Sequence, residues 1–132
     1  MEVFNVGEYR RKFFNGRKEA DWFDNSNTEA VQMREEVNDR AIADMEVFLN
    51  TYNNGIVILD SVNASFDRRL EIQSRMHACG AKVLFIEVQN TSESELSTNC
   101  IDVATTCPDY KDMDNDAAVC GYLFYMYTLV VE

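Results

Sequence analysis

Two continuous apolar runs, each ending at an acidic residue, constrain the fold of this chain most strongly. Residues 56–59 are all branched aliphatic and end at Asp60, and residues 83–86 are all apolar and end at Glu87. Runs without polar alternation are typical of strands buried on both faces in a parallel sheet. A short apolar run at residues 3–6, which ends at Gly7, predicts another strand.

Residues 27–50 carry the pattern of a long amphipathic helix. Apolar residues recur there at spacings of three and four, and Ser26 followed by Glu29 fits a capping box at the helix start. We expect the apolar stripe of this helix to pack in the core. The stripe consists of Ala30, Met33, Val37, Ala41, Met45 and Phe48.

Two further helices complete an alternation of strands and helices. Residues 65–76 predict a charged helix that ends near Gly80, and residues 92–103 predict another helix. This alternation predicts an α/β fold, with a parallel sheet flanked by helices, in a chain long enough for one domain. Ligands bind at the carboxyl ends of the strands in such sheets. The residues expected at those ends are Gly7, Asp60 and Glu87.

The charge of the chain limits its partners. The 132 residues hold 12 Lys and Arg against 23 Asp and Glu, a formal charge of −11. This balance argues against nucleic-acid binding through a broad basic face. Basic residues are nevertheless concentrated in the first twenty positions, which predicts an anion site or a solvated charged helix. They are Arg10, Arg11, Lys12, Arg17 and Lys18.

The two ends of the sequence bear on where the protein is found. The first residues lack the long apolar stretch of a secretory signal, so we expect a cytoplasmic protein with free thiols. Residues 117–131 carry no charge, but the run is shorter than the about 17–25 residues that a membrane span needs. We interpret it as a buried strand or helix, with a membrane anchor and a non-native tail as the alternatives.

Asp60 is the strongest candidate for chemistry. In phosphate-transferring enzymes, a strand of this type delivers a carboxylate beside Mg²⁺ and the terminal phosphate of a nucleotide. The matching phosphate-binding loop, G-x-x-x-x-G-K-[ST], does not occur in the 132 residues, because no glycine is followed by Lys. We therefore expect this chain alone to bind ATP poorly.

The order of several short segments resembles one enzyme family. The segments are VFNVGEYRR (3–11), the Asp60 strand with Asn63 and Arg68-Arg69, LFIE (84–87) and PDYKD (108–112). Together they resemble the kinase domain of 6-phosphofructo-2-kinase/fructose-2,6-bisphosphatase. The resemblance implies a partial P-loop NTPase-type parallel sheet, flanked by helices and lacking the P-loop strand, over residues 1–116. Residues 117–132 then form an apolar C-terminal tail.

The family's kinase domain transfers phosphate from ATP-Mg²⁺ to the 2-hydroxyl of fructose 6-phosphate. The resemblance implies that Arg10, Arg34 and Arg68 hold the sugar phosphate, a task that suits arginine because it binds phosphate through paired hydrogen bonds. It also implies that Asp60 is the catalytic carboxylate, on the metal side of the site. The residues expected along the nucleotide are Asn99, Cys100, Ile101, Asp102, Val103 and Ala104.

Three residues depart from the family pattern at this site. Val62 replaces a Thr, Asn90 replaces a Cys, and Ala104 replaces a Lys that faces the transferring phosphate. One such cation can be worth several kcal/mol in a closed site, so we expect no measurable turnover by the 132-residue chain. Three hypotheses stay open: part of a 6-phosphofructo-2-kinase; a non-catalytic module that binds hexose phosphate or joins subunits, either its own copies or full-length relatives; and a fragment that does not fold by itself.

Overall fold

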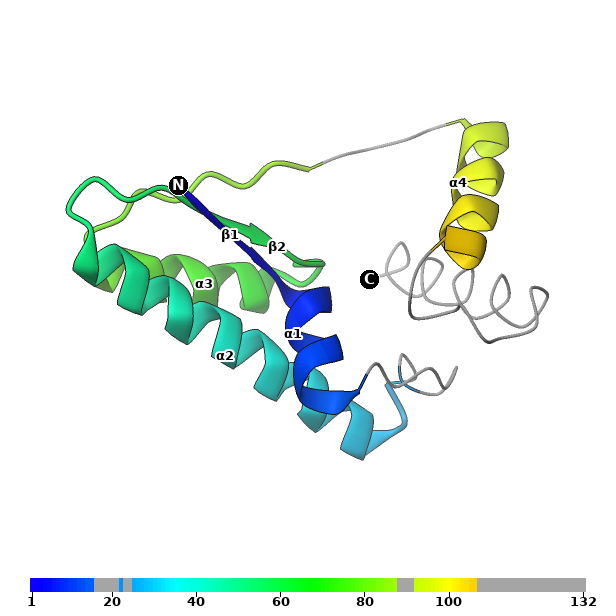
Figure 1. Ribbon diagram of the computed structural model, residues 1–132, viewed down its shortest axis with the longest axis horizontal. Helices are drawn as coiled ribbons and strands as arrows, with labels where there is room; N and C mark the ends of the chain where they lie inside the picture. Colours follow the sequence, from blue (N-terminus) through cyan, green and yellow to red (C-terminus); the bar gives the residue numbers. More distant parts are fainter. Residues whose placement is uncertain (16–21, 23–24, 88–91, 107–132) are drawn as a thin grey trace. The chain divides into compact units, whose positions relative to one another are not determined.

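The computed structural model describes residues 1–15, 22, 25–87 and 92–106 (Figure 1). The chain divides into two compact units, the first comprising residues 1–15 and 32–85 and the second the rest. In chain order the elements are β1 (Glu2–Asn5), α1 (Val6–Phe14), α2 (Thr28–Thr51), β2 (Val57–Asp60), α3 (Phe66–Ala78) and α4 (Glu93–Thr106).

A parallel pair of strands forms the sheet of the first unit. β1 and β2 align with Asn5 opposite Asp60, so both strands end at the same edge. β1 ends before Val6 because Asn5 caps α1, its Oδ1 accepting a hydrogen bond from the amide of Glu8 at 3.0 Å. The predicted α/β class and the parallel pairing are confirmed.

The core of this unit lies between the sheet and two helices. Phe4 of β1 packs with Ile42 and Met45 of α2 and with Ile72 and Met76 of α3. Figure 1 shows α2 and α3 along the same side of the two strands. Burial of one side of α2 confirms the predicted apolar stripe. Its buried members in this unit are Val37, Ala41 and Met45.

The start of α2 differs from the predicted capping box. The helix begins at Thr28, and Asn27 caps it by accepting a hydrogen bond on Oδ1 from the amide of Ala30 at 3.1 Å. The expected cap, Ser26, lies one residue further from the helix. Asn caps a helix as well as Ser does, so the sequence around residues 25–27 contains more than one suitable cap and does not decide between them.

Gly80 ends α3 as predicted. It has a φ of +74°, which glycine adopts without steric cost. Its amide donates to the carbonyl of His77 at 2.9 Å, and the amide of Ala81 donates to the carbonyl of Met76 at 3.0 Å. This pair of bonds is a Schellman motif, which satisfies carbonyls that the last turn of a helix would otherwise leave unpaired.

The prediction that β2 is buried on both faces is wrong for the described part of the chain. Ile58 of β2 is 44% exposed and Val3 of β1 is 53% exposed. Successive side chains of a strand point to opposite faces, and α2 and α3 cover only the face on which Phe4, Val57 and Leu59 pack. The opposite face is apolar and exposed.

The prediction of a strand at residues 83–86 is also wrong, because residues 81–87 have no regular secondary structure. Ala81 and Val83 pack against the core, whereas Leu84 is 82% exposed. Alternate side chains therefore reach the core although the backbone does not join the ladder of β1 and β2.

The edge of the sheet consequently holds fewer of the expected residues. Glu87 follows a segment without strand structure, and Gly7 lies within the first turn of α1. Asp60 ends β2 as predicted. The two strands of the described sheet therefore present Asn5 and Asp60 at their carboxyl ends.

α4 confirms the helix predicted over residues 92–103. Its first turn is capped by Ser92, whose Oγ accepts a hydrogen bond from the amide of Glu95 at 3.4 Å. Within the described ranges, no helix combines the length and apolar character required to cross a bilayer. The apolar run predicted over residues 117–131 lies outside the described residues.

We expect Ile42→Ala to lower the free energy of unfolding by about 2–5 kcal/mol, because Ile42 is fully buried where the sheet meets both helices. Urea unfolding followed by circular dichroism measures this change. Val47→Ala is the matched control, since Val47 is exposed on the same helix, and its effect should stay within about 0.5 kcal/mol. Equal effects of the two substitutions would contradict the described core.

Candidate functional site

The candidate site begins where the two strands end together. Asn5 donates a hydrogen bond from Nδ2 to Oδ2 of Asp60 at 2.6 Å. The same amide group caps α1 through its Oδ1. Asn5 thus ties the start of a helix to the carboxylate at the end of β2. The bond orients Asp60, which remains exposed to solvent.

Two aromatic residues of α1, Tyr9 and Phe13, contact α2 and hold the two helices together. The hydroxyl of Tyr9 donates to Oδ2 of Asp44 at 2.6 Å, and the guanidinium of Arg40 lies 4.3 Å from the centre of the Phe13 ring. Burial and the hydrogen bond to Asp44 raise the pKa of Tyr9 well above its ordinary value. These contacts fix the helix that carries Arg10, which is half-buried next to Tyr9.

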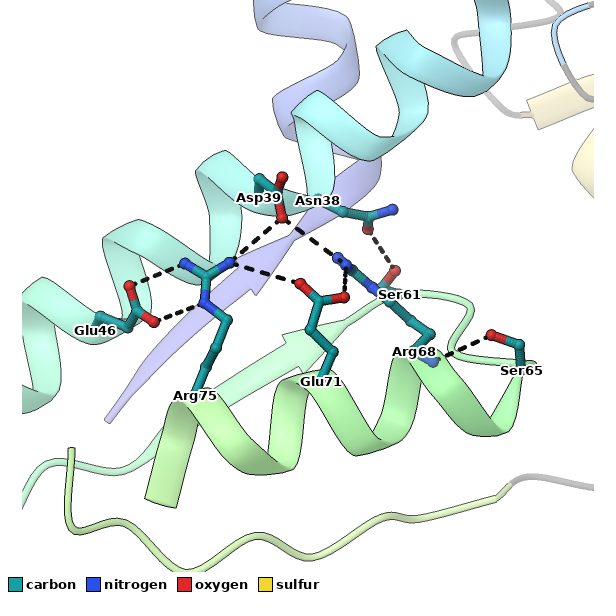
Figure 2. Close-up of polar contacts among 8 residues, drawn as sticks. All are labelled: Asn38, Asp39, Glu46, Ser61, Ser65, Arg68, Glu71 and Arg75. Atoms are coloured by element: carbon teal, nitrogen blue, oxygen red, sulfur yellow. Dashed lines mark hydrogen bonds and ion pairs between the residues drawn. The ribbon is translucent and has the colours of Figure 1, made fainter. Parts of the chain in front are cut away.

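The segment between β2 and α3 is fixed by polar contacts at both of its ends. Ser61 donates from Oγ to Oδ1 of Asn38 on α2 at 3.3 Å (Figure 2). Asn63 donates from Nδ2 to the carbonyl of Ser61 at 3.2 Å. Arg69 donates from Nη1 to the carbonyl of Asn63 at 2.8 Å and also to that of Ala64. The segment that follows Asp60 is therefore anchored to α2 and to α3.

Arg68 lies in the first turn of α3. Its amide donates to Oγ of Ser65 at 3.2 Å, which caps the helix. Its Nη1 lies 2.7 Å from a carboxylate oxygen of Glu71. Its Nε and Nη2 are buried and have no hydrogen-bond partner among the described residues. Buried donors without partners are uncommon in native proteins, and here they form the guanidinium edge that binds anions through two parallel bonds.

Arg34 belongs to the same side of α2 as the contact with the segment after β2. It precedes Asn38 by four residues, and residues four apart lie on one face of a helix. Because Asn38 accepts the hydrogen bond of Ser61, this face of α2 is directed toward the carboxyl end of β2. Arg34 itself is half-buried. α1, α2 and α3 thus each contribute one of the three predicted arginines.

A group of charged residues that includes Arg68 connects α2 and α3 (Figure 2). Arg75 binds Glu46 through two bonds, from Nε at 2.7 Å and from Nη2 at 2.9 Å. Its Nη1 lies 3.3 Å from Asp39 and 3.9 Å from Glu71. Asp39 is also 3.9 Å from Nη1 of Arg68. We call these five residues the α2–α3 charge network.

The residues predicted to contact a nucleotide all fall within α4, in the second unit. Asn99, Ile101 and Asp102 are exposed, and Val103 is half-buried. The carbonyl of Asp102 accepts a hydrogen bond from the hydroxyl of Thr106 at 2.6 Å. Cys100 and Ala104 complete the predicted set on this helix.

Two of the three departures from the family pattern fall on described residues. Val62 is 51% exposed in the segment between β2 and α3. Its side chain has no donor or acceptor to offer a ligand. Ala104 is in α4, and Asn90 lies outside the described residues.

The described residues contain no group of three or more side chains suited to hold a metal ion. Mg²⁺ needs only one or two protein carboxylates where substrate phosphates supply other oxygens. Asp60 fits that requirement, because it is exposed at the strand end and Asn5 uses one of its oxygens.

Two features of the site were not recognised from the sequence. The first is Asn5, although its spacing of three residues from Glu8 fits a helix cap followed by an acid. The second is the α2–α3 charge network, which joins residues up to 36 positions apart. Among its contacts, only the pairs within α3 could have been indicated by spacing: Arg68 with Glu71, three residues apart, and Glu71 with Arg75, four residues apart.

Comparison of the sequence with known proteins indicates one enzyme family. A family model described as 6-phosphofructo-2-kinase matches residues 1–127. The 6-phosphofructo-2-kinase/fructose-2,6-bisphosphatase of Gallus gallus is 31% identical over 121 residues, covering 92% of this chain and 26% of that protein. The protein of the same name from Caenorhabditis elegans is 34% identical over 117 residues, covering 85% and 26%. The chain thus spans about a quarter of the length of these curated relatives.

The pair of Arg75 with Glu46 makes the stability of the protein depend on pH. The hydrogen bonds from Arg75 hold the pKa of Glu46 below its ordinary value, against the opposing effect of burial. A carboxyl group whose pKa is lowered by folding stabilises the fold fully at pH values above the pKa that the group has in the unfolded chain. This stabilisation is lost as the pH falls through the pKa of the group in the folded protein.

We therefore expect Glu46→Gln to lower the free energy of unfolding by about 1 kcal/mol at pH 7 and by much less at pH 3. Urea unfolding at both pH values measures the difference. Glu35→Gln serves as the control, because Glu35 is an exposed carboxylate on the same helix. A deficit of Glu46→Gln that is as large at pH 3 as at pH 7 would contradict this role of the ion pair.

Proposed function

Since this chain belongs to the 6-phosphofructo-2-kinase family, we propose that it carries the sugar-phosphate side of a phosphoryl-transfer site for fructose 6-phosphate. The proposal includes the P-loop NTPase type of fold and the transfer of a phosphoryl group from ATP to the 2-hydroxyl of the sugar. It concerns an activity of proteins of which this chain spans about a quarter.

The observation that carries the proposal is the unpaired guanidinium edge of Arg68. Nε and Nη2 of Arg68 are buried without a partner in the described part of the chain, in the first turn of a helix of 13 residues. A phosphate group accepts two parallel hydrogen bonds from such an edge, and the amino end of a helix favours its negative charge. In this proposal Arg10 and Arg34 are the further phosphate ligands.

Asp60 supplies the carboxylate at the reacting end of the site. Asn5 holds it in one orientation at 2.6 Å, and positioning of this kind is a large part of how phosphoryl transfer is accelerated. ATP with Mg²⁺, when bound, supplies the phosphoryl group and neutralises its charge. Asp60 would contribute an oxygen to the metal, and the stretch from Asn99 to Ala104 on α4 would lie along the nucleotide.

A second function is binding without turnover. Val62 favours it, because an exposed apolar side chain stands where a hydroxyl would contact substrate. Ala104 favours it as well, since alanine provides no cation for the transferring phosphate. A chain of this kind would bind a hexose phosphate, or join full-length subunits of the family or its own copies, through a site that still contains its phosphate ligands.

We expect Arg68→Ala to weaken the binding of fructose 6-phosphate by at least about tenfold, because one bidentate charged contact is lost. Isothermal titration calorimetry on the 132-residue chain measures this. The control is Lys82→Ala, which removes one positive charge from an exposed residue outside the site. Unchanged affinity in Arg68→Ala, or an equal loss in both variants, would refute the proposed phosphate site.

Formation of fructose 2,6-bisphosphate distinguishes the two functions. We expect the purified 132-residue chain to bind fructose 6-phosphate and to form no product with ATP and Mg²⁺. Product formation that Asp60→Asn abolishes would instead establish the phosphotransferase for this chain.

A further inference from the structure

Two arginines on one side of α3 have contrasting environments (Figure 2). In Arg75, the edge formed by Nε and Nη2 is filled by the two oxygens of Glu46, at 2.7 and 2.9 Å. In Arg68, the same edge is buried and has no hydrogen-bond partner within the described ranges. The two residues are seven positions apart, which is about two turns of a helix. One guanidinium is therefore fully occupied within the protein, and the other keeps its best anion-binding edge unused.

Both arginines share the same two carboxylates through their Nη1 atoms. Glu71 places one oxygen 2.7 Å from Nη1 of Arg68 and the other 3.9 Å from Nη1 of Arg75. Asp39 lies 3.3 Å from Nη1 of Arg75 and 3.9 Å from Nη1 of Arg68. Arg75 is thus the nearer partner of Asp39, and it also attracts Glu71 from the side away from Arg68.

The carboxylates shared by the two arginines affect how strongly Arg68 can bind an anion. The α2–α3 charge network holds three carboxylates against two guanidinium groups, and Glu71 is in direct contact with Arg68. A carboxylate in contact with an arginine competes with a phosphate for the same positive charge. If Arg75 were absent, both Asp39 and Glu71 would have Arg68 as their only cationic partner in the network.

We propose that Glu71 is a built-in competitor for the anion at Arg68, and that Arg75 is a positioning residue that restrains this competitor. Glu46 fixes Arg75 from α2, and Arg75 in turn holds Asp39 and Glu71 so that they contact only Nη1 of Arg68. The Nε–Nη2 edge of Arg68 is thereby kept free of a carboxylate partner among the described residues, which is the edge that a phosphate would use. This inference rests on the proposed function, because it states that Glu71 and Arg75 change the affinity of the phosphate site proposed at Arg68.

The test is calorimetry of the full 132-residue chain with fructose 6-phosphate, using fructose as the ligand without phosphate. We expect Glu71→Gln to bind the sugar phosphate about threefold more tightly, because the amide still accepts a hydrogen bond but carries no charge. We expect Arg75→Met to bind about tenfold more weakly, because both carboxylates then turn to Arg68. The affinity for fructose should be the same in all of the variants.

The double variant Arg75→Met/Glu71→Gln separates this role from a structural one. Removing the competitor should restore most of the affinity lost in Arg75→Met, whereas a defect of folding would persist. Lys82→Met is the matched control for loss of one positive charge, since Lys82 is exposed and lies outside the network. Thermal unfolding of each variant shows whether it folds, and if Arg75→Met does not, Glu71→Gln alone decides.

The outcomes distinguish this inference from the proposed function. If Arg68→Ala weakens binding while Glu71→Gln and Arg75→Met bind as the unmodified chain does, the positioning role is overturned and the phosphate site stands. If Arg68→Ala has no effect, the phosphate site itself is overturned. If neither the unmodified chain nor Glu71→Gln binds fructose 6-phosphate, both are overturned.

Discussion

The parallel pairing of β1 with β2 is the contact on which the candidate site depends. Its register sets Asn5 opposite Asp60, and the resulting hydrogen bond connects the start of α1 to the carboxylate at the strand end. A shift of one residue would turn Asp60 to the other face of the sheet. The apolar contacts of Phe4 with α2 and α3 oppose such a shift, because Phe4 would leave the core.

The interface of α2 with α3 combines two kinds of contact. Toward the sheet it is apolar, where Ile42 and Met45 meet Ile72 and Met76. Away from the sheet it is ionic, and the α2–α3 charge network joins the same helices. The apolar side supplies most of the stabilisation, since ion pairs at half-exposed positions contribute little. The ionic side instead determines how Arg68 is presented, which apolar packing cannot specify.

Local patterns predicted most of the elements, and tertiary contacts account for the errors in the sheet. The run ending at Asp60 and the glycine at position 80 carry their structural meaning within a few residues, so both were recognised. The apolar run at residues 83–86 fits a strand equally well, but strand pairing depends on partners far along the chain, and the described backbone does not pair there. Arg68 was identified by resemblance, whereas its contacts with Asp39 arise only when α3 packs on α2.

The hydrogen bond between Asn5 and Asp60 joins residues 55 positions apart, and this separation has a consequence for how the protein folds. Closing a long loop costs chain entropy before its contacts can repay it. α2, β2 and α3 are consecutive in the sequence, so they can associate through short connections. β1 and α1 join them only by a long closure. The carboxylate site is therefore expected to be completed late in folding, after the two helices that support it have come together.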